Sequence, residues 1–155
     1  MDKREIYETV TSEIAAVLDG ETDRIAQMAT ISCLLSQAFP ERYFWTGFYL
    51  VDTKKPDELV VGPYQGTLGC LRIAFGRGVC GTAAATGETQ LVEDVHAIPN
   101  HIACDSRSNS EIVVPVFDEG GKLIAVFDVD STEFSAFDNV DQEYLEALMK
   151  NTFAA

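Results

Sequence analysis

A cysteine in a polar, turn-prone stretch is the side chain best placed to do chemistry. Cys104 lies in HIACDSRSNSEIVVPVF, with His101 three residues before it and Arg107 three residues after it. Positive charge near a thiol favours the nucleophilic thiolate, whereas the carboxylate of the neighbouring Asp105 disfavours it, and the sequence leaves the balance open. The stretch then enters an apolar run that opens with Glu111. We therefore expect a reactive thiol just ahead of a buried strand.

Three further cysteines are present, Cys33, Cys70 and Cys80. The sequence shows no hydrophobic signal region, so we expect a reducing, cytoplasmic compartment and no permanent disulfide framework. Cys70 and Cys80 fall at predicted loop or turn positions, where either thiol can condense with an oxidised Cys104 to form a disulfide. Cys33 falls inside a predicted helix, which indicates a core thiol.

Acidic side chains gather in the last predicted hairpin. DEGG separates EIVVPVF from KLIAVFDVD, and in a symmetric hairpin about this turn Phe117 pairs with Lys122. Glu111 then lies opposite Asp128, and Asp130 shares their otherwise apolar face. Carboxylates this close repel each other unless a proton or a cationic ligand group lies between them. Two alternatives remain. At a frayed strand end in water the repulsion is small, and neither a proton nor a ligand is needed. A bulge at the proline of the first strand would place Glu111 on the opposite face from the two aspartates.

The stretch WTGFYL is aromatic and typical of a strand. Alternation places Trp45, Gly47 and Tyr49 on one face of it. The other face takes Phe44, Phe48 and Leu50. Either the glycine between two rings leaves a hollow on the sheet, or Gly47 only permits close packing, and the sequence favours neither.

The stretch GRGVCG matches the G-x-G-x-x-G pattern of dinucleotide-binding sites. The helix that it opens is only about two turns long, and no parallel-sheet rhythm surrounds it, so we do not predict such a site. The free N–H groups at the helix start can bind a small carboxylate, and a plain tight turn explains the pattern equally well.

A zinc site in this sequence would be built from Cys80, His96, His101 and Cys104. No C-x-x-C pair occurs among them, and the deaminase signature is absent. We therefore predict no metal, and expect both histidines to be polar loop residues.

The predicted elements form one domain, residues 1–155, of α+β class. Helical patterns cover 2–18, 23–39 and 138–153, and strand patterns cover 43–51, 58–62, 71–75, 90–94 and the two arms of the last hairpin. This order predicts a central antiparallel sheet with the N- and C-terminal helices packed on one face. The net charge of −14 argues against nucleic acid and anionic membranes as partners, and no run of eighteen apolar residues occurs.

Four stretches strongly resemble the free methionine-(R)-sulfoxide reductases, which are single GAF domains. They are WTGFYL, LVVGPYQGTLGC, FGRGVCGTAAATGETQLVEDVHAIPNHIACDSRSNSEIVVPVF and GKLIAVFDVDS. The resemblance implies that Cys104 is the catalytic cysteine, that Cys70 is the usual resolving cysteine and that Cys80 is a third family cysteine whose part is open. It implies recharging by thioredoxin and no bound organic cofactor. It leaves a homodimer open.

The resemblance also implies a pocket for free methionine sulfoxide. Trp45 and Tyr49 match the aromatic residues around the methyl-sulfur end, and Glu111, Asp128 and Asp130 match the acids around the sulfoxide oxygen and the amino group. A sulfoxide becomes a good electrophile when its oxygen is protonated, and a crowded carboxylate with a raised pKa can supply that proton. We expect the proton on Glu111. The alternative is a GAF-type small-molecule sensor without chemistry, which would not need loop cysteines beside acids.

Overall fold

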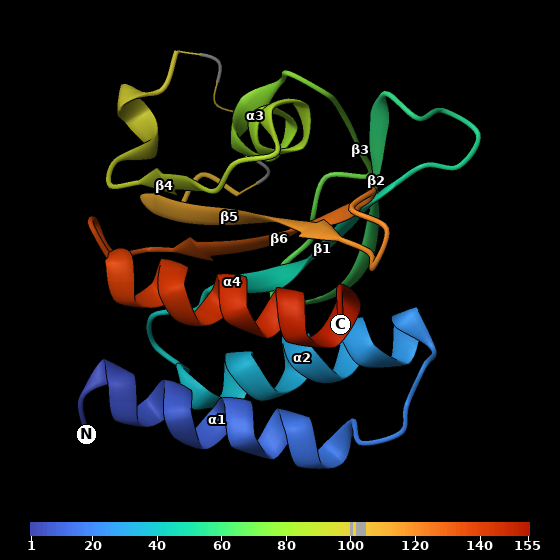
Figure 1. Cartoon of the computed structure of the whole chain (residues 1–155). Coiled ribbons are helices and arrows are strands. Elements are labelled where there is room, and N and C mark those ends of the chain that lie inside the picture. Colours follow the sequence, from blue (N-terminus) through green and yellow to red (C-terminus); the bar gives the residue numbers. More distant parts are fainter. Residues whose placement is uncertain (100, 102–104) are drawn as a thin grey trace.

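The computed structural model of the chain describes residues 1–99, 101 and 105–155 (Figure 1). Its helices are α1 (Lys3–Val17), α2 (Arg24–Ala38), α3 (Gly78–Thr86) and α4 (Asn139–Phe153), with a short 3₁₀ helix η1 (Val95–Ala97). Its strands are β1 (Trp45–Val51), β2 (Glu58–Gln65), β3 (Arg72–Ala74), β4 (Gln90–Val92), β5 (Ser110–Phe117) and β6 (Leu123–Ser131).

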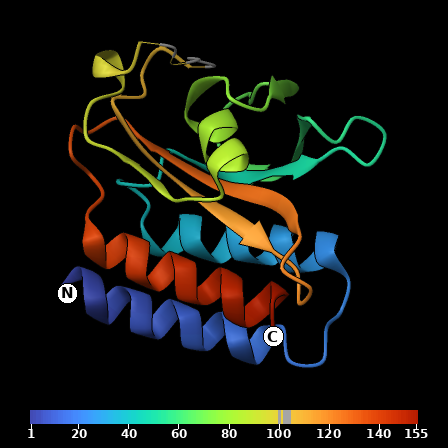
Figure 2. The same ribbon diagram turned by 45° about the horizontal axis from the view of Figure 1, so that its top comes forward.

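The strands form one antiparallel sheet in the order β3-β2-β1-β6-β5-β4. Helices α2 and α4 contact one face of this sheet, and α1 packs against both of them on the outside. The opposite face is covered by α3 and the connections around it (Figures 1 and 2). The predicted arrangement, an antiparallel sheet with terminal helices on one face, is therefore confirmed. No helix in the described part of the chain is both long and apolar enough to cross a membrane.

The two faces of the sheet carry separate cores because strand side chains alternate. On the helical face the buried strand residues include Phe48, Ile112, Val114, Phe127 and Val129. On the α3 face they include Trp45, Tyr49, Val113 and Val126. A sheet buried on both faces holds the strands rigidly, so side chains that project from β5 and β6 toward α3 have well-defined positions.

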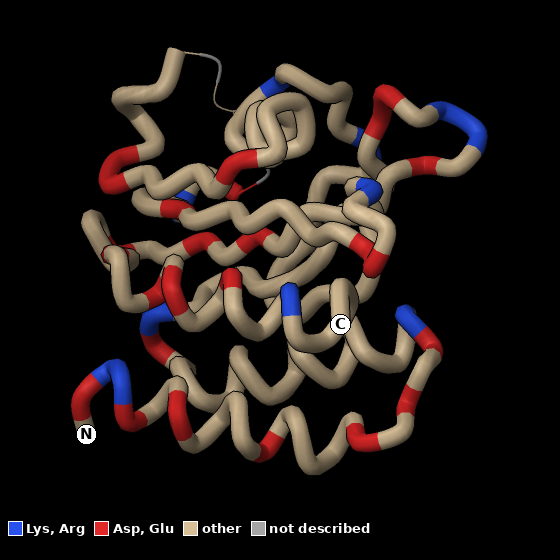
Figure 3. The backbone as a smooth tube through the Cα atoms, in the orientation of Figure 1, with Lys and Arg blue, Asp and Glu red and all other residues tan. Residues whose placement is uncertain are grey.

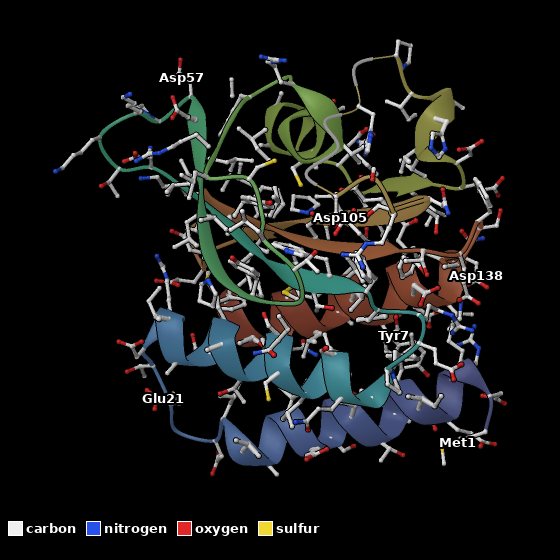
Figure 4. The ribbon with its side chains drawn as sticks, turned by 180° about the vertical axis from the view of Figure 1, so that it is seen from behind. Met1, Tyr7, Glu21, Asp57, Asp105 and Asp138 are labelled. Atoms are coloured by element: carbon white, nitrogen blue, oxygen red, sulfur yellow. The ribbon has the colours of Figure 1, made fainter. Side chains whose placement is uncertain are left out.

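A buried polar contact ties the two ends of the chain together. Asp138 caps α4 and forms a capping box with Asp141, whose side chain is fully buried. The Lys3 ammonium donates to Asp141 at 2.6 Å, and the Tyr7 hydroxyl donates to it at 2.5 Å. Tyr7 and Asp138 both lie in the helical layer (Figure 4). One carboxylate therefore fixes α1 against α4.

The predicted register of the β5–β6 hairpin is wrong by two residues. The Asp118 amide donates to the Lys122 carbonyl, so the turn is one residue longer than expected and Phe117 pairs with Leu123. A β-bulge between Val116 and Phe117 adds a second shift in the same direction.

These two shifts place Glu111 opposite Asp130, where the sequence predicted Asp128. A shift of one residue would have turned Glu111 to the other face, whereas a shift of two keeps it on the predicted face. Asp128 lies two residues along β6 and therefore still shares that face. The predicted acidic group forms, with its members paired differently.

Two smaller predictions fail on the helical side. Cys33 is half-buried and not in the core, and its sulfur accepts from the Gln37 side-chain amide at 3.6 Å. Ile25, which the helical spacing of DRIAQMATISCLLSQAF places on one apolar stripe with Met28, Leu35 and Phe39, is 53% exposed. Both lie at the margin of the stripe, where a small rotation of the helix decides burial.

Candidate active site

A pocket opens on the α3 face of the sheet. Its lining comes from β1, β3, α3, β5, β6 and the connections that precede β3, α3 and β5. The lining residues are Trp45, Tyr49, Leu68, Gly69, Ile73, Arg77, Gly78, Val79, Cys80, His101, Asp105, Ser108, Glu111, Asp128 and Asp130. Every described residue that the sequence predicted for the site lines it, with the exception of Cys70. The labelled Asp105 lies on this side of the sheet, away from Tyr7 and the helical layer (Figure 4).

The acidic wall of the pocket consists of Glu111, Asp128 and Asp130. Across the sheet, Asp130 pairs with Glu111 on one side and with Trp45 on the other. Glu111 and Asp128 are each only 4% exposed. One oxygen of each, Glu111 Oε1 and Asp128 Oδ1, has no hydrogen-bond partner among the described residues. Buried oxygens of this kind are costly unless a proton or a ligand satisfies them.

Burial and repulsion from neighbouring charges disfavour ionisation of the two aspartates of this wall. Burial raises the pKa of Asp128 well above its ordinary value, and the charges of Asp130 and Glu111 raise it further. The pKa of Asp130 is raised in the same way, by burial first and then by the charge of Glu111. Two acids so close lose their protons as a coupled pair. The pocket can therefore retain a proton at a pH where an isolated carboxyl group would have lost it.

The aromatic wall stands beside the acids. The Trp45 ring stacks on Tyr49 with centroids 5.5 Å apart and on Tyr64 with centroids 5.0 Å apart, and its indole N–H donates to the Thr67 carbonyl at 2.8 Å. A Cβ on Gly47 would lie 2.2 Å from the Tyr64 Cβ. Of the two alternatives for Gly47, close packing is therefore correct. The apolar surface comes from the fixed Trp45 ring.

His101 has a place in the pocket that its sequence context did not reveal. Its Nε2 lies 3.5 Å from Glu111 Oε1, and its side chain is only 13% exposed. The other histidine, His96, is exposed and pairs with Asp94 of its own turn. Both histidines lie between β4 and β5, His96 in the short η1 turn and His101 in irregular backbone as expected, but only His96 faces solvent. The only signal in the sequence was the position of His101 three residues before Cys104.

The opposed charges around the cysteine loop pair with each other. The Arg107 guanidinium donates to both oxygens of Asp105, and the Thr67 hydroxyl donates to Asp105 at 2.9 Å. These bonds, those from Arg107 first, hold the pKa of Asp105 far below its ordinary value. Arg107 also lies over the Phe44 ring, 4.9 Å from its centroid. Arg107 thus neutralises Asp105, and neither charge stands alone in the loop.

The cysteines differ in chemical state. Cys70 is disulfide-bonded, whereas Cys33 and Cys80 are free thiols, and Cys104 lies outside the described residues. Cys80 is 5% exposed, and its sulfur lies 4.0 Å from Glu111 Oε2. Burial raises the pKa of Cys80 well above its ordinary value, and the charges of Asp128 and Glu111 raise it further. Cys80 is therefore held as a thiol and is a weak nucleophile.

Comparison with known proteins agrees with this architecture. The family model described as "GAF domain" matches residues 4–152. The chain belongs to the GAF domain family. Among curated GAF relatives, "GAF domain-containing protein A" of Dictyostelium discoideum is 46% identical over 96% of this chain and 90% of its own length. The "Free methionine-R-sulfoxide reductase" of Escherichia coli (strain K12) is 44% identical over 96% of this chain and 87% of its own length.

Solved GAF structures superpose closely on the fold. The free methionine-R-sulfoxide reductase from Neisseria meningitidis, solved in complex with its substrate, has a TM-score of 0.91 and 51% identity, covering 97% of this chain and 87% of that one. The GAF domain of a Coxiella burnetii phosphoenolpyruvate-protein phosphotransferase has a TM-score of 0.82 at 16% identity, covering 97% of this chain and 92% of that one. The second likeness bears on the fold alone.

Proposed function

We propose that the protein reduces free L-methionine (R)-sulfoxide to methionine. The observation that carries the proposal is the pair of buried, unpartnered carboxylate oxygens on Glu111 and Asp128, which lie beside the Trp45 ring. A small zwitterion with a cationic amino group, a polar S–O bond and a methyl group has the complementary chemistry. The similarity to proteins named free methionine-R-sulfoxide reductase, at 44% and 51% identity, supports the same assignment.

The acidic and aromatic walls contact different parts of the substrate. Trp45 and Tyr49 contact the methyl-sulfur end, where apolar rings favour the uncharged group. The acidic wall takes the α-ammonium group and the sulfoxide oxygen. A peptide bond would remove the ammonium charge, so the acids select the free amino acid over the same residue within a protein.

The acidic wall also supplies the proton. Asp128 combines a raised pKa with near-complete burial, so it is the best candidate to hold a proton near neutral pH. We assign it the donor role that the sequence suggested for Glu111. Glu111 acts on the reaction by raising the pKa of Asp128 and by facing the sulfoxide oxygen.

The chemistry at sulfur then needs one thiol. The thiolate of Cys104 attacks the sulfoxide sulfur while Asp128 donates its proton to the oxygen. The S–O bond breaks, the hydroxyl group passes to Cys104 as a sulfenic acid, and methionine leaves with the electron pair. The thiol is oxidised by two electrons, and the sulfoxide is reduced by two.

A second thiol closes the cycle. The thiolate of Cys70 attacks the sulfenic sulfur, water leaves, and a Cys70–Cys104 disulfide forms. Cys70 suits this role because Cys80 is buried beside acids that keep it protonated. Thioredoxin in a reducing cytoplasm then exchanges its dithiol for the disulfide. A homodimer is compatible with this cycle, since every proposed group comes from one chain.

Methionine release from free methionine (R)-sulfoxide, with thioredoxin and its reductase as the recycling system, tests the proposal. Cys33→Ser is the control and should match the parent. We expect turnover with the free R sulfoxide and little turnover with its N-acetylated, amidated form. Equal rates on both substrates would overturn the proposed role of the acids, and no turnover on either would leave a ligand-binding GAF domain.

A further inference from the structure

The pocket holds a set of donor atoms that suits a metal ion. The sulfur of Cys80 and one carboxylate oxygen each of Glu111 and Asp128 all lie within 4.8 Å of one another. These residues come from α3 and from the two strands of the β5–β6 hairpin. All three side chains are buried, so the donors are positioned by packed elements and not by a surface loop.

His101 supplies a fourth donor at the edge of this set. Its Nε2 lies 3.5 Å from Glu111 Oε1. In a tetrahedral zinc site with metal–ligand distances of about 2.0–2.3 Å, ligand atoms lie roughly 3.3–3.6 Å apart. The Cys80 sulfur is 4.0 Å from Glu111 Oε2, and the three buried donors lie within 4.8 Å of one another. Side-chain movements of more than about an ångström, including an inward movement of the His101 ring, would bring all four donors to ligand distances.

The charge of the pocket favours a cation. Glu111 Oε1 and Asp128 Oδ1 are buried without hydrogen-bond partners among the described residues. Within the same residues, no lysine or arginine forms an ion pair with any acid of this wall. A divalent ion would satisfy both oxygens at once and neutralise the excess negative charge.

The kinds of donor indicate which ion. A thiolate and an imidazole together with carboxylates are the ligands of Zn²⁺ and of Co²⁺, whereas Mg²⁺ and Ca²⁺ take oxygen alone. We propose that the substrate-free pocket binds one Zn²⁺ through Cys80, Glu111, Asp128 and His101. On binding, the thiol of Cys80 and the carboxyl group of Asp128 release their protons to solvent as their bonds to zinc form, and no electron is transferred.

This site differs from the set of cysteines and histidines that the sequence analysis considered, for which no metal was predicted. Cys80 and His101 belong to both sets, whereas His96 is exposed and bound to Asp94. Two carboxylates from the β5–β6 hairpin take the remaining places. Spacing rules for zinc sites did not find the set because its ligands come from separate elements, which only the folded sheet brings together.

Metal and substrate would compete for the same acids. This consequence rests on the proposed function, in which the acidic wall receives the α-ammonium group of methionine sulfoxide. Zn²⁺ would then inhibit reduction reversibly, because Glu111 and Asp128 cannot coordinate the ion and bind the substrate together.

Titration of the reduced, chelator-treated protein with Co²⁺ tests the site directly. We expect one equivalent to bind with a sulfur-to-cobalt charge-transfer band in the near ultraviolet and to be displaced by Zn²⁺. Cys80→Ser should abolish the band, and Asp128→Asn should weaken binding by more than about tenfold. Cys33→Ser, which removes the free thiol of the opposite layer, should behave as the parent.

A double variant, Cys70→Ser with Cys104→Ser, separates this site from the proposed redox thiols. It should keep the band, since neither sulfur is a proposed ligand. Loss of the band in this variant, or its persistence in Cys80→Ser, would overturn the site, as would the absence of stoichiometric binding. Methionine release is measured separately without metal, so a failed metal site and a failed reductase assignment give different results.

Discussion

Glu111 of β5 lies directly opposite Asp130 of β6, on a sheet face that is otherwise lined by apolar and aromatic side chains. Directly opposed positions bring side chains within about 5 Å at Cβ, a distance at which like charges repel strongly when water is excluded. Asp128, two residues along β6, is the most buried aspartate of the wall. The charge of Glu111 therefore contributes to the raised pKa of both aspartates, and its removal should change their ionisation.

Glu111→Gln should shift the pH dependence of the chemical step. The charge of Glu111 helps to raise the pKa of Asp128, so its removal lowers that pKa. The parent's rate falls as pH rises through the raised pKa, and in the variant this alkaline limb should move to lower pH. Single-turnover methionine release against pH measures it. Complete loss of the limb, with a rate lower by roughly 10²–10⁴, would make Glu111 itself the acid.

The three cysteine-to-serine variants should differ in their single-turnover and steady-state rates. Cys104→Ser should release no methionine, because it removes the attacking sulfur. Cys70→Ser should release one equivalent and then recycle slowly with thioredoxin. Cys80→Ser should recycle as the parent does, because Cys80 is held protonated in the parent and contributes little as a nucleophile. One equivalent of methionine from Cys104→Ser, or unimpaired recycling in Cys70→Ser, would contradict these assignments.

The face of the acidic group could be predicted from the sequence, and its pairing could not. Alternation along β6 places Asp128 and Asp130 on one face. Glu111 of β5 shares that face whenever the true register differs from the predicted one by an even number of residues. The turn and the bulge at Val116 and Phe117 each moved the register by one residue. The neighbouring Pro115 is a signal for a bulge, but it does not fix the direction of the shift or the extra residue in the turn. Their sum happens to restore the predicted face.

The contact between His101 and Glu111 could not be predicted either. The two residues are ten positions apart, and the path of the connection between them decides whether they meet. In contrast, Asp105 and Arg107 are two residues apart, and their pairing follows from the local turn. The helices were predictable to within a residue or two because aspartates mark the start of α1, α2 and α4.

Tyr7→Phe should destabilise the fold without touching the pocket. The variant removes the hydroxyl group that donates to Asp141 and that also contacts the Tyr43 hydroxyl at 2.6 Å. Leaving these buried groups unsatisfied costs about 1–3 kcal/mol of unfolding free energy. Tyr144→Phe is the matched control, since its hydroxyl bonds to Glu8 at the surface, and it should cost less than about 0.5 kcal/mol. Urea unfolding measures both, and equal effects would contradict the structural role of the buried contact.

Asp128→Asn should stabilise the fold and reduce the activity. Burial and the charges of Asp130 and Glu111 raise the pKa of Asp128 in the folded protein. An unfolded aspartate loses its proton near pH 3.9, so the folded chain binds the extra proton and the parent loses stability as pH rises from about 4 toward the raised pKa. The asparagine variant cannot ionise, so this slope should flatten and its unfolding free energy at neutral pH should increase by roughly 0.5–2 kcal/mol.

The same substitution should slow single-turnover methionine release by roughly 10²–10⁴ and remove the alkaline limb of its pH profile, because the proton donor is gone. Asp57→Asn is the control and should change neither property, because Asp57 is exposed and lies well apart from the pocket residue Asp105 in Figure 4. Acidic residues are spread over the whole backbone in Figure 3, so the loss of one exposed carboxylate is a small change. Thermal unfolding between pH 4 and pH 8 and rapid-quench assays over the same range provide the two measurements. A variant that is less stable than the parent at neutral pH, or one that keeps the alkaline limb, would show that Asp128 is ionised in the folded protein and that the proton comes from elsewhere.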